Sequence, residues 1–291
     1  MKRFGRSLKY VYLGVMLLFL YLPIIYLIVF SFNDFGGGRH ISYTNLGKWN
    51  GFTFKNYGSV FDGDAGEALK TTLLVAGISS VVATIIGTAA AIGINAMKKR
   101  SRTAILSVSQ LPMVNPDLVT GITFMMLFVF INSVLVKINV RIGDIPSLLI
   151  AHISFSIPYV IFSVLPRLKQ SSDLLYEAAL DLGCSPLKAL WKVVIPDIMP
   201  GISTGFIMAL TMSLDDFVVS YFVSYYTPVL STYIYSSARV TRGVNPALAT
   251  VIFIPLVAML IAVNVRRLAK EREYEVQNKK VKLKDKGGNI K

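Results

Sequence analysis

The sequence predicts an all-α protein that crosses a membrane six times. Its mean hydropathy is +0.58 and only 16% of its 291 residues are charged, which lies outside the range of ordinary soluble domains. Its formal net charge of +14 comes from basic residues that gather at the ends of long apolar runs. This distribution is typical of membrane spans and not of nucleic-acid grooves, so we expect membrane lipid and no nucleic acid around the chain.

Six stretches have the length that a bilayer core requires, about 20 apolar helical residues. They are 12–32, 71–96, 104–131, 147–165, 201–225 and 247–265. Prolines lie inside or beside several of these spans, at positions 23, 112, 116, 158 and 255. Because a proline frees a backbone carbonyl and favours a bend, we expect a bundle of bent helices.

The first span follows a short basic segment, residues 1–11, and so has the outline of a signal peptide. It runs for 21 residues without a charge, however, and no small-residue cleavage site follows it. A cleaved hydrophobic region is shorter than this. We therefore expect 12–32 to be retained as a span.

The orientation follows from the distribution of Lys and Arg between the connecting segments. With the amino end in the cytoplasm, the cytoplasmic segments hold 22 basic residues and the external segments hold eight. The short cluster at 98–102 contributes four of the 22. Since cytoplasmic loops carry the excess of Lys and Arg, we expect both termini in the cytoplasm, with 269–291 as a basic cytoplasmic tail.

The third and fifth spans contain acidic residues, which the other spans lack. Asp117 follows Asn115-Pro116, and Asp215 and Asp216 are adjacent in the fifth span. An ionised carboxylate near the bilayer centre costs at least a few kcal/mol, so these side chains should face the bundle interior or a wet cavity. Neighbouring residues on a helix point about 100° apart, so both aspartates can face one path only if the helix is broken there.

Two interpretations of these aspartates remain open. In the first, one carboxylate contacts a cationic solute beside an aromatic wall formed by Phe217, Tyr221 or Tyr225. In the second, one aspartate caps a helix break and the other pairs with a neighbouring helix or subunit. Asp117 has the same two interpretations, as a cap or as a solute contact.

The cytoplasmic stretch 173–196 predicts two short helices joined by a turn. An apolar stripe at helical spacing includes Leu174, Leu175 and Ala179, and Gly183 stands where a left-handed closing residue belongs. Ser185-Pro186 is typical of a second helix start, and we expect Pro196 to end that helix.

This stretch resembles the EAA loop of ABC importer permeases. The resemblance rests on Glu177-Ala178-Ala179, Gly183 and the ending Val193-x-Ile195-Pro196. Val193 and Ile195 are mild departures from the Ile and Leu that the family usually has. The resemblance also covers 52–57 and 68–73, and it extends from about residue 8 to residue 268.

The resemblance implies a type I (MetI-like) permease domain over 12–268 in a bacterial plasma membrane. It implies that the first helix of the loop docks in a groove of an ATPase subunit. Leu174, Leu175, Ala178 and Ala179 would fill the groove, Glu177 would contact its rim, and Gly183 would allow the turn. The implied partners are an ABC ATPase dimer that binds ATP and Mg, a second permease subunit and an extracytoplasmic binding protein.

The cargo expectation comes from further runs that resemble permeases of spermidine/putrescine importers. They are 212–220, Asn115-Pro116-Asp117, 150–155 and 167–169. The resemblance implies a polyamine substrate. A permease for another small solute, such as iron, thiamine or phosphonate, remains an alternative, and so does an ion-gradient secondary transporter, which would not need an EAA loop.

Enzymatic chemistry has no candidate residues in the sequence. Cys184 is the only cysteine, His40 and His152 lie in different segments, and there is no phosphate-binding Gly-x-x-x-x-Gly-Lys-Ser/Thr loop. We therefore expect a transporter subunit that holds no cofactor or metal of its own. We interpret His152 as a hydrogen-bonded packing residue.

Overall fold

The structure is a computed structural model that describes residues 2–34, 41–42, 48–138, 141–170, 173–240, 243–255, 257–258, 261–262 and 265. The expected basic tail at 269–291 lies outside these residues. The chain forms two compact units, Met1–Leu248 and Ala249–Lys291, and each is described by itself.

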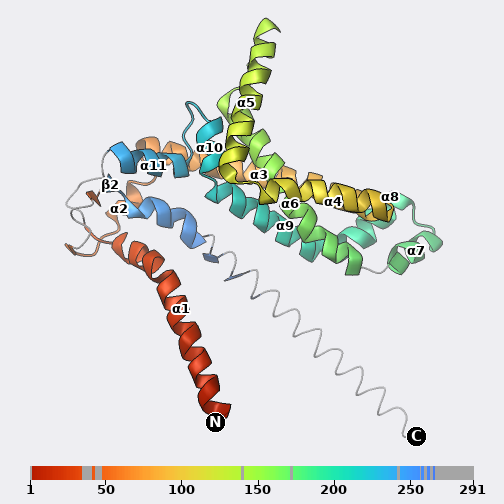
Figure 1. Cartoon of the computed structure of the whole chain (residues 1–291), viewed down its shortest axis with the longest axis horizontal. Coiled ribbons are helices and arrows are strands. Elements are labelled where there is room, and N and C mark those ends of the chain that lie inside the picture. The colour runs from red at the N-terminus through yellow and green to blue at the C-terminus, as the bar shows by residue number, and fades with distance from the viewer. Residues whose placement is uncertain are drawn as a thin grey trace. The chain divides into compact units, whose positions relative to one another are not determined.

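Helices make up nearly all of the described secondary structure (Figure 1). In the first half of the chain they are α1 (Lys2–Phe30), α2 (Lys55–Gly58), α3 (Gly63–Ala96), α4 (Lys99–Val114), α5 (Asp117–Leu135) and the 3-10 turn Val136–Ile138. In the second half they are α6 (Asp144–Gln170), α7 (Asp173–Asp181), α8 (Pro186–Ala189), the π-helical turn Leu190–Val194, α9 (Ile195–Asp215), α10 (Val218–Val223) and α11 (Leu230–Val240). Two-residue strands β1 (Ile41–Ser42) and β2 (Gly243–Val244) pair antiparallel, with Ile41 opposite Val244.

The core of the first unit is the packing of α3, α6 and α9 against one another. Val160 of α6 lies at their junction. A Cβ added at Gly87 of α3 would come within 2.7 Å of the Val160 Cβ, and one added at Gly205 of α9 would come within 3.1 Å of its Cγ1. The two glycines therefore allow three apolar helices to approach at one point, which is the way that small residues act in membrane bundles.

The third expected span, 104–131, is two helices and not one. Helix α4 ends at Val114, Asn115 is extended (φ −69°, ψ 135°), and α5 begins at Asp117. The cause is Pro116, because a proline disfavours the α conformation of the residue before it. Only α5 has the length and composition of a membrane span.

The fifth span departs from expectation at Pro196, which does not end the second loop helix. Helix α8 continues through the π-helical turn Leu190–Val194 into α9 without interruption. In a regular α-helix the ring of Pro196 would clash with the carbonyl four residues earlier. A wider turn at that point relieves the clash, so the helix passes through the proline.

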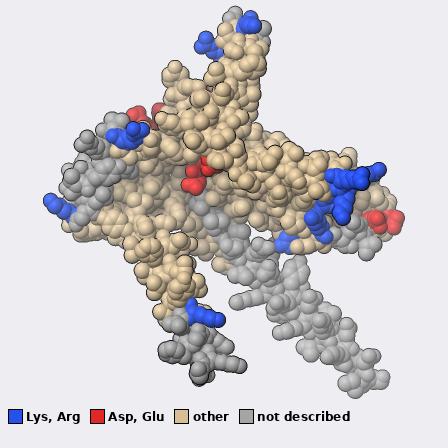
Figure 2. Space-filling view, viewed as in Figure 1, with Lys and Arg blue, Asp and Glu red and all other residues tan. Residues whose placement is uncertain are grey.

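Within the described part of the chain, five helical segments are long and apolar enough to cross a membrane: Lys9–Phe30, Gly63–Ala96, Asp117–Leu135, Asp144–Gln170 and Pro186–Asp215. In the region of the sixth expected span, 247–265, the described residues include an apolar helix at Pro246–Pro255. Several residues after Pro255 lie outside the description. On the face drawn in Figure 2, Lys and Arg gather toward the ends of the molecule, and the surface between them carries no Lys or Arg and only a small acidic patch near its middle.

Side-chain amides form hydrogen bonds in the described part of the connection between α1 and α3. Asn56 Nδ2 donates to the carbonyl oxygens of Ser31 and Asn33, both at 2.8 Å. Asn245 Nδ2 donates in turn to Asn56 O (3.1 Å) and Ser59 Oγ (3.0 Å). These bonds join the end of α1 to the segment that follows β2.

Candidate functional site

The turn between α7 and α8 has the geometry that its sequence predicts. Gly183 has φ +82°, in the left-handed region that favours glycine. Its N–H donates to Leu180 O at 2.9 Å, and Cys184 N–H donates to Ala179 O at 3.0 Å. This pair of bonds is the Schellman arrangement, which satisfies the last carbonyls of a helix and reverses the chain sharply.

The side chains that this loop exposes are not all those expected to fill a groove of the ATPase subunit. Glu177 and Ala178 are exposed, but Ala179 is only 7% exposed and packs inside this chain. The side chains of Leu174 and Leu175 lie outside the described residues. The large apolar side chains that the loop exposes are Leu182 (86%), Leu187 and Trp191. Leu182 belongs to the apolar stripe predicted for the first helix of the loop, whereas Leu187 and Trp191 lie outside that stripe and were not predicted as contact residues.

The fifth span is broken between Asp215 and Asp216. A break at this place is the condition under which both adjacent aspartates could face one path. Helix α9 ends at Asp215, and Asp216 is extended (φ −66°, ψ 123°). The Asp216 carboxylate accepts the N–H groups of Val219 (3.2 Å) and Ser220 (2.7 Å) in the first turn of α10. Asp216 therefore caps the helix that restarts after the break.

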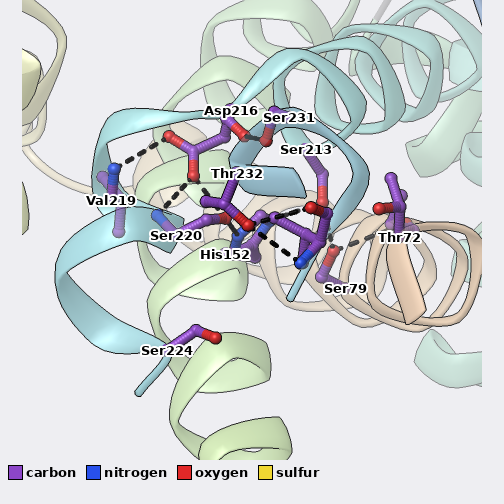
Figure 3. Close-up of polar contacts among 12 residues, drawn as sticks. Thr72, Ser79, His152, Ser213, Asp216, Val219, Ser220, Ser224, Ser231 and Thr232 are labelled. Atoms are coloured by element: carbon purple, nitrogen blue, oxygen red, sulfur yellow. Dashed lines mark hydrogen bonds and ion pairs between the residues drawn. The ribbon is translucent and has the colours of Figure 1, made fainter. Parts of the chain in front are cut away.

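His152 of α6 lies buried beside this break, and its ring contacts both sides of it (Figure 3). Its Nδ1 is 2.6 Å from Ser213 Oγ, before the break, and its Nε2 is 3.1 Å from Ser220 Oγ, after it. The same Nε2 is 3.6 Å from Asp216 Oδ2. Ser79 of α3 extends the network with an Oγ–Oγ distance of 3.1 Å to Ser213. The expectation of a hydrogen-bonded packing residue is confirmed for His152.

The start of α11 joins the same network from the other side. Ser231 Oγ donates to Asp216 O at 2.7 Å, and Leu230 N–H donates to Thr72 Oγ1 of α3 at 2.8 Å. The space between these residues is too small to hold a water molecule. The network is therefore dry, and a partner removed from it is not replaced by water without rearrangement.

Asp215 differs from Asp216 in having an uncompensated carboxylate. It is exposed, and among the described residues no hydrogen bond or ion pair of its side chain is found.

Directly after the break, Phe217 and Tyr221 meet Tyr235 of α11, with ring centroids 4.8 Å apart for Phe217–Tyr235 and 6.0 Å apart for Tyr221–Tyr235. Arg239 lies over the Tyr235 ring at 5.6 Å and donates to its hydroxyl at 3.0 Å. Phe217, Tyr221 and Tyr235 are called the aromatic face below.

Tyr235 was not predicted as part of this site. It lies on a different helix from Tyr221 and meets Phe217 and Tyr221 only in the folded chain, so the spacing of residues in the sequence does not indicate the contact. Tyr225, the other tyrosine considered from the sequence, is exposed in the connection between α10 and α11. That connection is held by Asp144 at the start of α6, whose Oδ2 accepts from Tyr226 N–H (2.6 Å) and Thr227 N–H (2.9 Å). Ser224 Oγ also donates to Thr227 O.

Asp117 is the first residue of α5 and lies exposed in its first turn, where a negative charge is favourable to the helix. Helix α5 packs closely on α10 at Gly121, where an added Cβ would be 2.9 Å from Phe222 Cδ2. Among the described residues, no group of three or more His, Cys, Asp or Glu could hold a metal ion.

An apolar helical bundle with an interrupted span and a structured polar loop defines a polytopic membrane protein built around an internal polar site. The sequence matches the family described as "Binding-protein-dependent transport system inner membrane component" over residues 83–272, so the chain belongs to that family. It is therefore a multi-pass membrane protein.

Curated relatives extend the similarity over most of the chain. The spermidine/putrescine transport system permease protein PotC of Escherichia coli K12 is 34% identical over 263 residues, which cover 89% of this chain and 93% of PotC. The putrescine transport system permease protein PotI of the same organism is 31% identical and covers 89% of this chain and 91% of PotI. PotC of Haemophilus influenzae is 32% identical over 87% of this chain and 94% of that protein.

The fold is also similar to that of a bacterial ABC transporter involved in the import of the acidic polysaccharide alginate, known from a crystal structure. The TM-score is 0.65 with 19% identity, and the match covers 93% of this chain and 96% of that one. The expected all-α ABC importer permease fold is thus confirmed.

Proposed function

We propose that this chain is a permease subunit of an ATP-driven importer and that its cargo is a polyamine, spermidine or putrescine. The relatives named above are permease components of polyamine transport systems, and they align over nearly their whole length. The site supports a cationic cargo because it combines one uncompensated carboxylate with an aromatic face.

The observation that carries the cargo proposal is the contrast between the two aspartates. Asp216 accepts two backbone N–H groups, and His152 Nε2 lies 3.6 Å from its Oδ2, so its carboxylate already has polar partners within the chain. Asp215 is exposed and ends a membrane-spanning helix, where an ionised carboxylate is costly without a partner. A protonated amine beside Asp215 would supply that partner, and the aromatic face would bind the same cation through cation–π contacts.

Coupling to ATP is proposed at the loop 173–196, which would dock on a separate ATPase subunit that binds ATP and Mg. Glu177 and Ala178 remain candidates for the contact because both are exposed. Leu182, Leu187 and Trp191 add a large apolar surface on the same loop. Exposed aromatic and aliphatic side chains on a defined scaffold are typical anchors of protein interfaces.

Two further partners are proposed, a second permease subunit and an extracytoplasmic binding protein. Half of the residues in the apolar membrane-spanning stretch of α6 are buried within this chain. The corresponding share is 11% for α5 and 6% for α1. The uncovered apolar surfaces of α1 and α5 would be covered by lipid and by the second permease. The family description and the alginate transporter complex with a periplasmic protein support the binding protein.

The orientation proposed from the basic residues places both termini and loop 173–196 in the cytoplasm. The segment around α2 and the connection held by Asp144 would then face outward. This arrangement separates the ATPase contact from the side on which solute arrives.

Uptake of radiolabelled spermidine tests the proposal in vesicles that contain the chain with its partner permease, ATPase and binding protein. We expect uptake that requires ATP and is lost when the ATPase subunit is omitted. Uptake that persists without the ATPase but follows an ion gradient would contradict the importer assignment. ATP-dependent uptake of another solute but not of spermidine or putrescine would contradict the cargo.

A further inference from the structure

The two parts of the fifth span are joined by two residues that belong to neither helix, Asp216 and Phe217, and Asp216 is extended. The backbone hydrogen bonds that make a helix stiff are interrupted there, so α9 and α10 need another connection to keep a fixed angle. Asp215 and the aromatic face lie on either side of the break. Their relative position therefore depends on the helices that pack on α9 and α10 and on any side chain that bridges the break.

His152 is the side chain that bridges the break directly. One ring nitrogen meets Ser213 in α9 and the other meets Ser220 in α10, so the two contacts hold opposite sides of the interruption. Because a neutral imidazole has one donor and one acceptor nitrogen and hydroxyl groups can act as either, both contacts form without a charge on the ring.

The bridge is anchored to a rigid part of the molecule. His152 lies in α6, a 27-residue helix that packs on both α3 and α9. Its side chain is 2% exposed, and the space around it is too small to hold a water molecule. Loss of one hydrogen bond would leave a buried group unpaired, and a shift of the break is one way to relieve it.

We propose that His152 is a positioning residue for transport, which fixes the angle between α9 and α10 and thereby the position of Asp215 relative to the aromatic face. The proposal rests on the proposed function for its link to transport. Its structural part, the position of residue 215, can be measured without any cargo.

The test uses Asp215→Cys as a reporter in a chain whose only other cysteine, Cys184, is replaced by serine. The rate of modification by a small cationic thiol reagent is measured in membranes that contain the complete transporter. Tyr226→Cys, in the exposed connection held by Asp144, is the reference position. His152→Ala and Ser220→Ala remove the bridge from its two ends.

The matched control is Ser79→Ala, which removes a hydroxyl from the same dry network on the α3 side but does not touch the break. We expect H152A and S220A to change the labelling rate at 215 by about fivefold or more, the effect of one lost hydrogen bond. We expect S79A to leave that rate within about twofold, because Ser213 keeps its contact with His152 when the Ser79 hydroxyl is removed. The rate at 226, which lies outside the network, should stay constant in all variants.

Several results would overturn the proposal. One is an unchanged labelling rate at 215 in S220A and H152A, and another is an equal change in S79A. A residue 215 that never reacts would also overturn it, because the proposed position requires access. If H152A does not reach the membrane, S220A alone decides.

Uptake is measured in parallel with Asp215 intact. A shifted labelling rate together with normal spermidine uptake in H152A would overturn the transport role of His152. Absence of spermidine uptake in the unmodified transporter would refute the proposed cargo, and the labelling result would still decide the position of residue 215.

Discussion

The loop 173–196 and the break at Asp216 are both interruptions of apolar helices, but they are built in opposite ways. The loop is stabilised by backbone bonds around Gly183 and exposes large apolar side chains to a partner. The break is stabilised by side chains from α3, α6, α10 and α11 and buries almost all of its polar groups. A surface for another subunit thus needs a locally determined shape, whereas a site inside the bundle needs several helices to define it.

The largest expected effect is at the turn of the loop. Gly183→Arg places a bulky residue at φ +82°, which costs about 1–2 kcal/mol for a residue with a Cβ and alters the docking surface. We expect uptake to fall to background while the protein still inserts in the membrane. Gly183→Asn is the matched control, because asparagine tolerates the left-handed conformation, and it should keep most of the uptake. Equal uptake in the Arg and Gly forms would remove the loop from the coupling mechanism.

The second prediction compares the two aspartates of the break. Asp215→Asn removes the proposed counter-charge of the cargo and should lower uptake by about 10- to 100-fold, the range for a hydrogen bond to a charged group. Asp216→Asn should be milder, since asparagine caps a helix about as well as aspartate. Initial rates of labelled spermidine uptake at equal membrane levels measure both. A stronger loss in D216N than in D215N would reverse the assignment of the two roles.

A smaller effect is expected for the apolar anchor of the loop. Trp191→Ala should weaken binding of the ATPase subunit by about fivefold or more, as truncation of an interface anchor costs about 1 kcal/mol or more. Val108→Ala, at an exposed apolar position of α4, is the control that should leave binding unchanged. Pull-down of the ATPase from detergent extracts provides the measurement. Equal binding by the W191A and unmodified chains would show that Trp191 contacts lipid instead.

The smallest effect concerns the aromatic face. Tyr235→Ala removes one ring and should lower uptake by about two- to fivefold, which corresponds to an exposed cation–π contact. Tyr235→Phe keeps the ring and loses only the hydroxyl that accepts from Arg239, so its uptake should stay near normal. If both variants lost uptake equally, the hydroxyl and not the ring would be the important group.

Sequence reasoning was most successful where the structure is determined locally. A glycine after an apolar helical stripe predicts the left-handed turn that Gly183 makes, and adjacent aspartates in a span predict a break if both are to face one path. It was least successful where distant segments meet. Tyr235 in the aromatic face, Thr72 bonded to Leu230 and Asp144 bonded to Tyr226 depend on helix packing that periodicity does not encode.

The errors at prolines have a related cause. Pro116 divides the third span, whereas Pro196 is passed through a π-helical turn in the fifth. Both prolines lack an N–H donor, but the residue before Pro116 is extended and ends its helix, whereas the wider turn before Pro196 lets the helix continue. The sequence predicts that a proline disturbs a helix and leaves open whether the helix ends, bends or widens.

Accessibility of Cys184 tests the central claim most directly, because this single cysteine follows Gly183 in the loop proposed to meet the ATPase. A membrane-impermeant thiol reagent is applied to intact cells and to inside-out vesicles that contain the unmodified chain. The account predicts labelling in inside-out vesicles and none in intact cells. Labelling of Cys184 in intact cells would place the loop outside the cytoplasm and contradict the account.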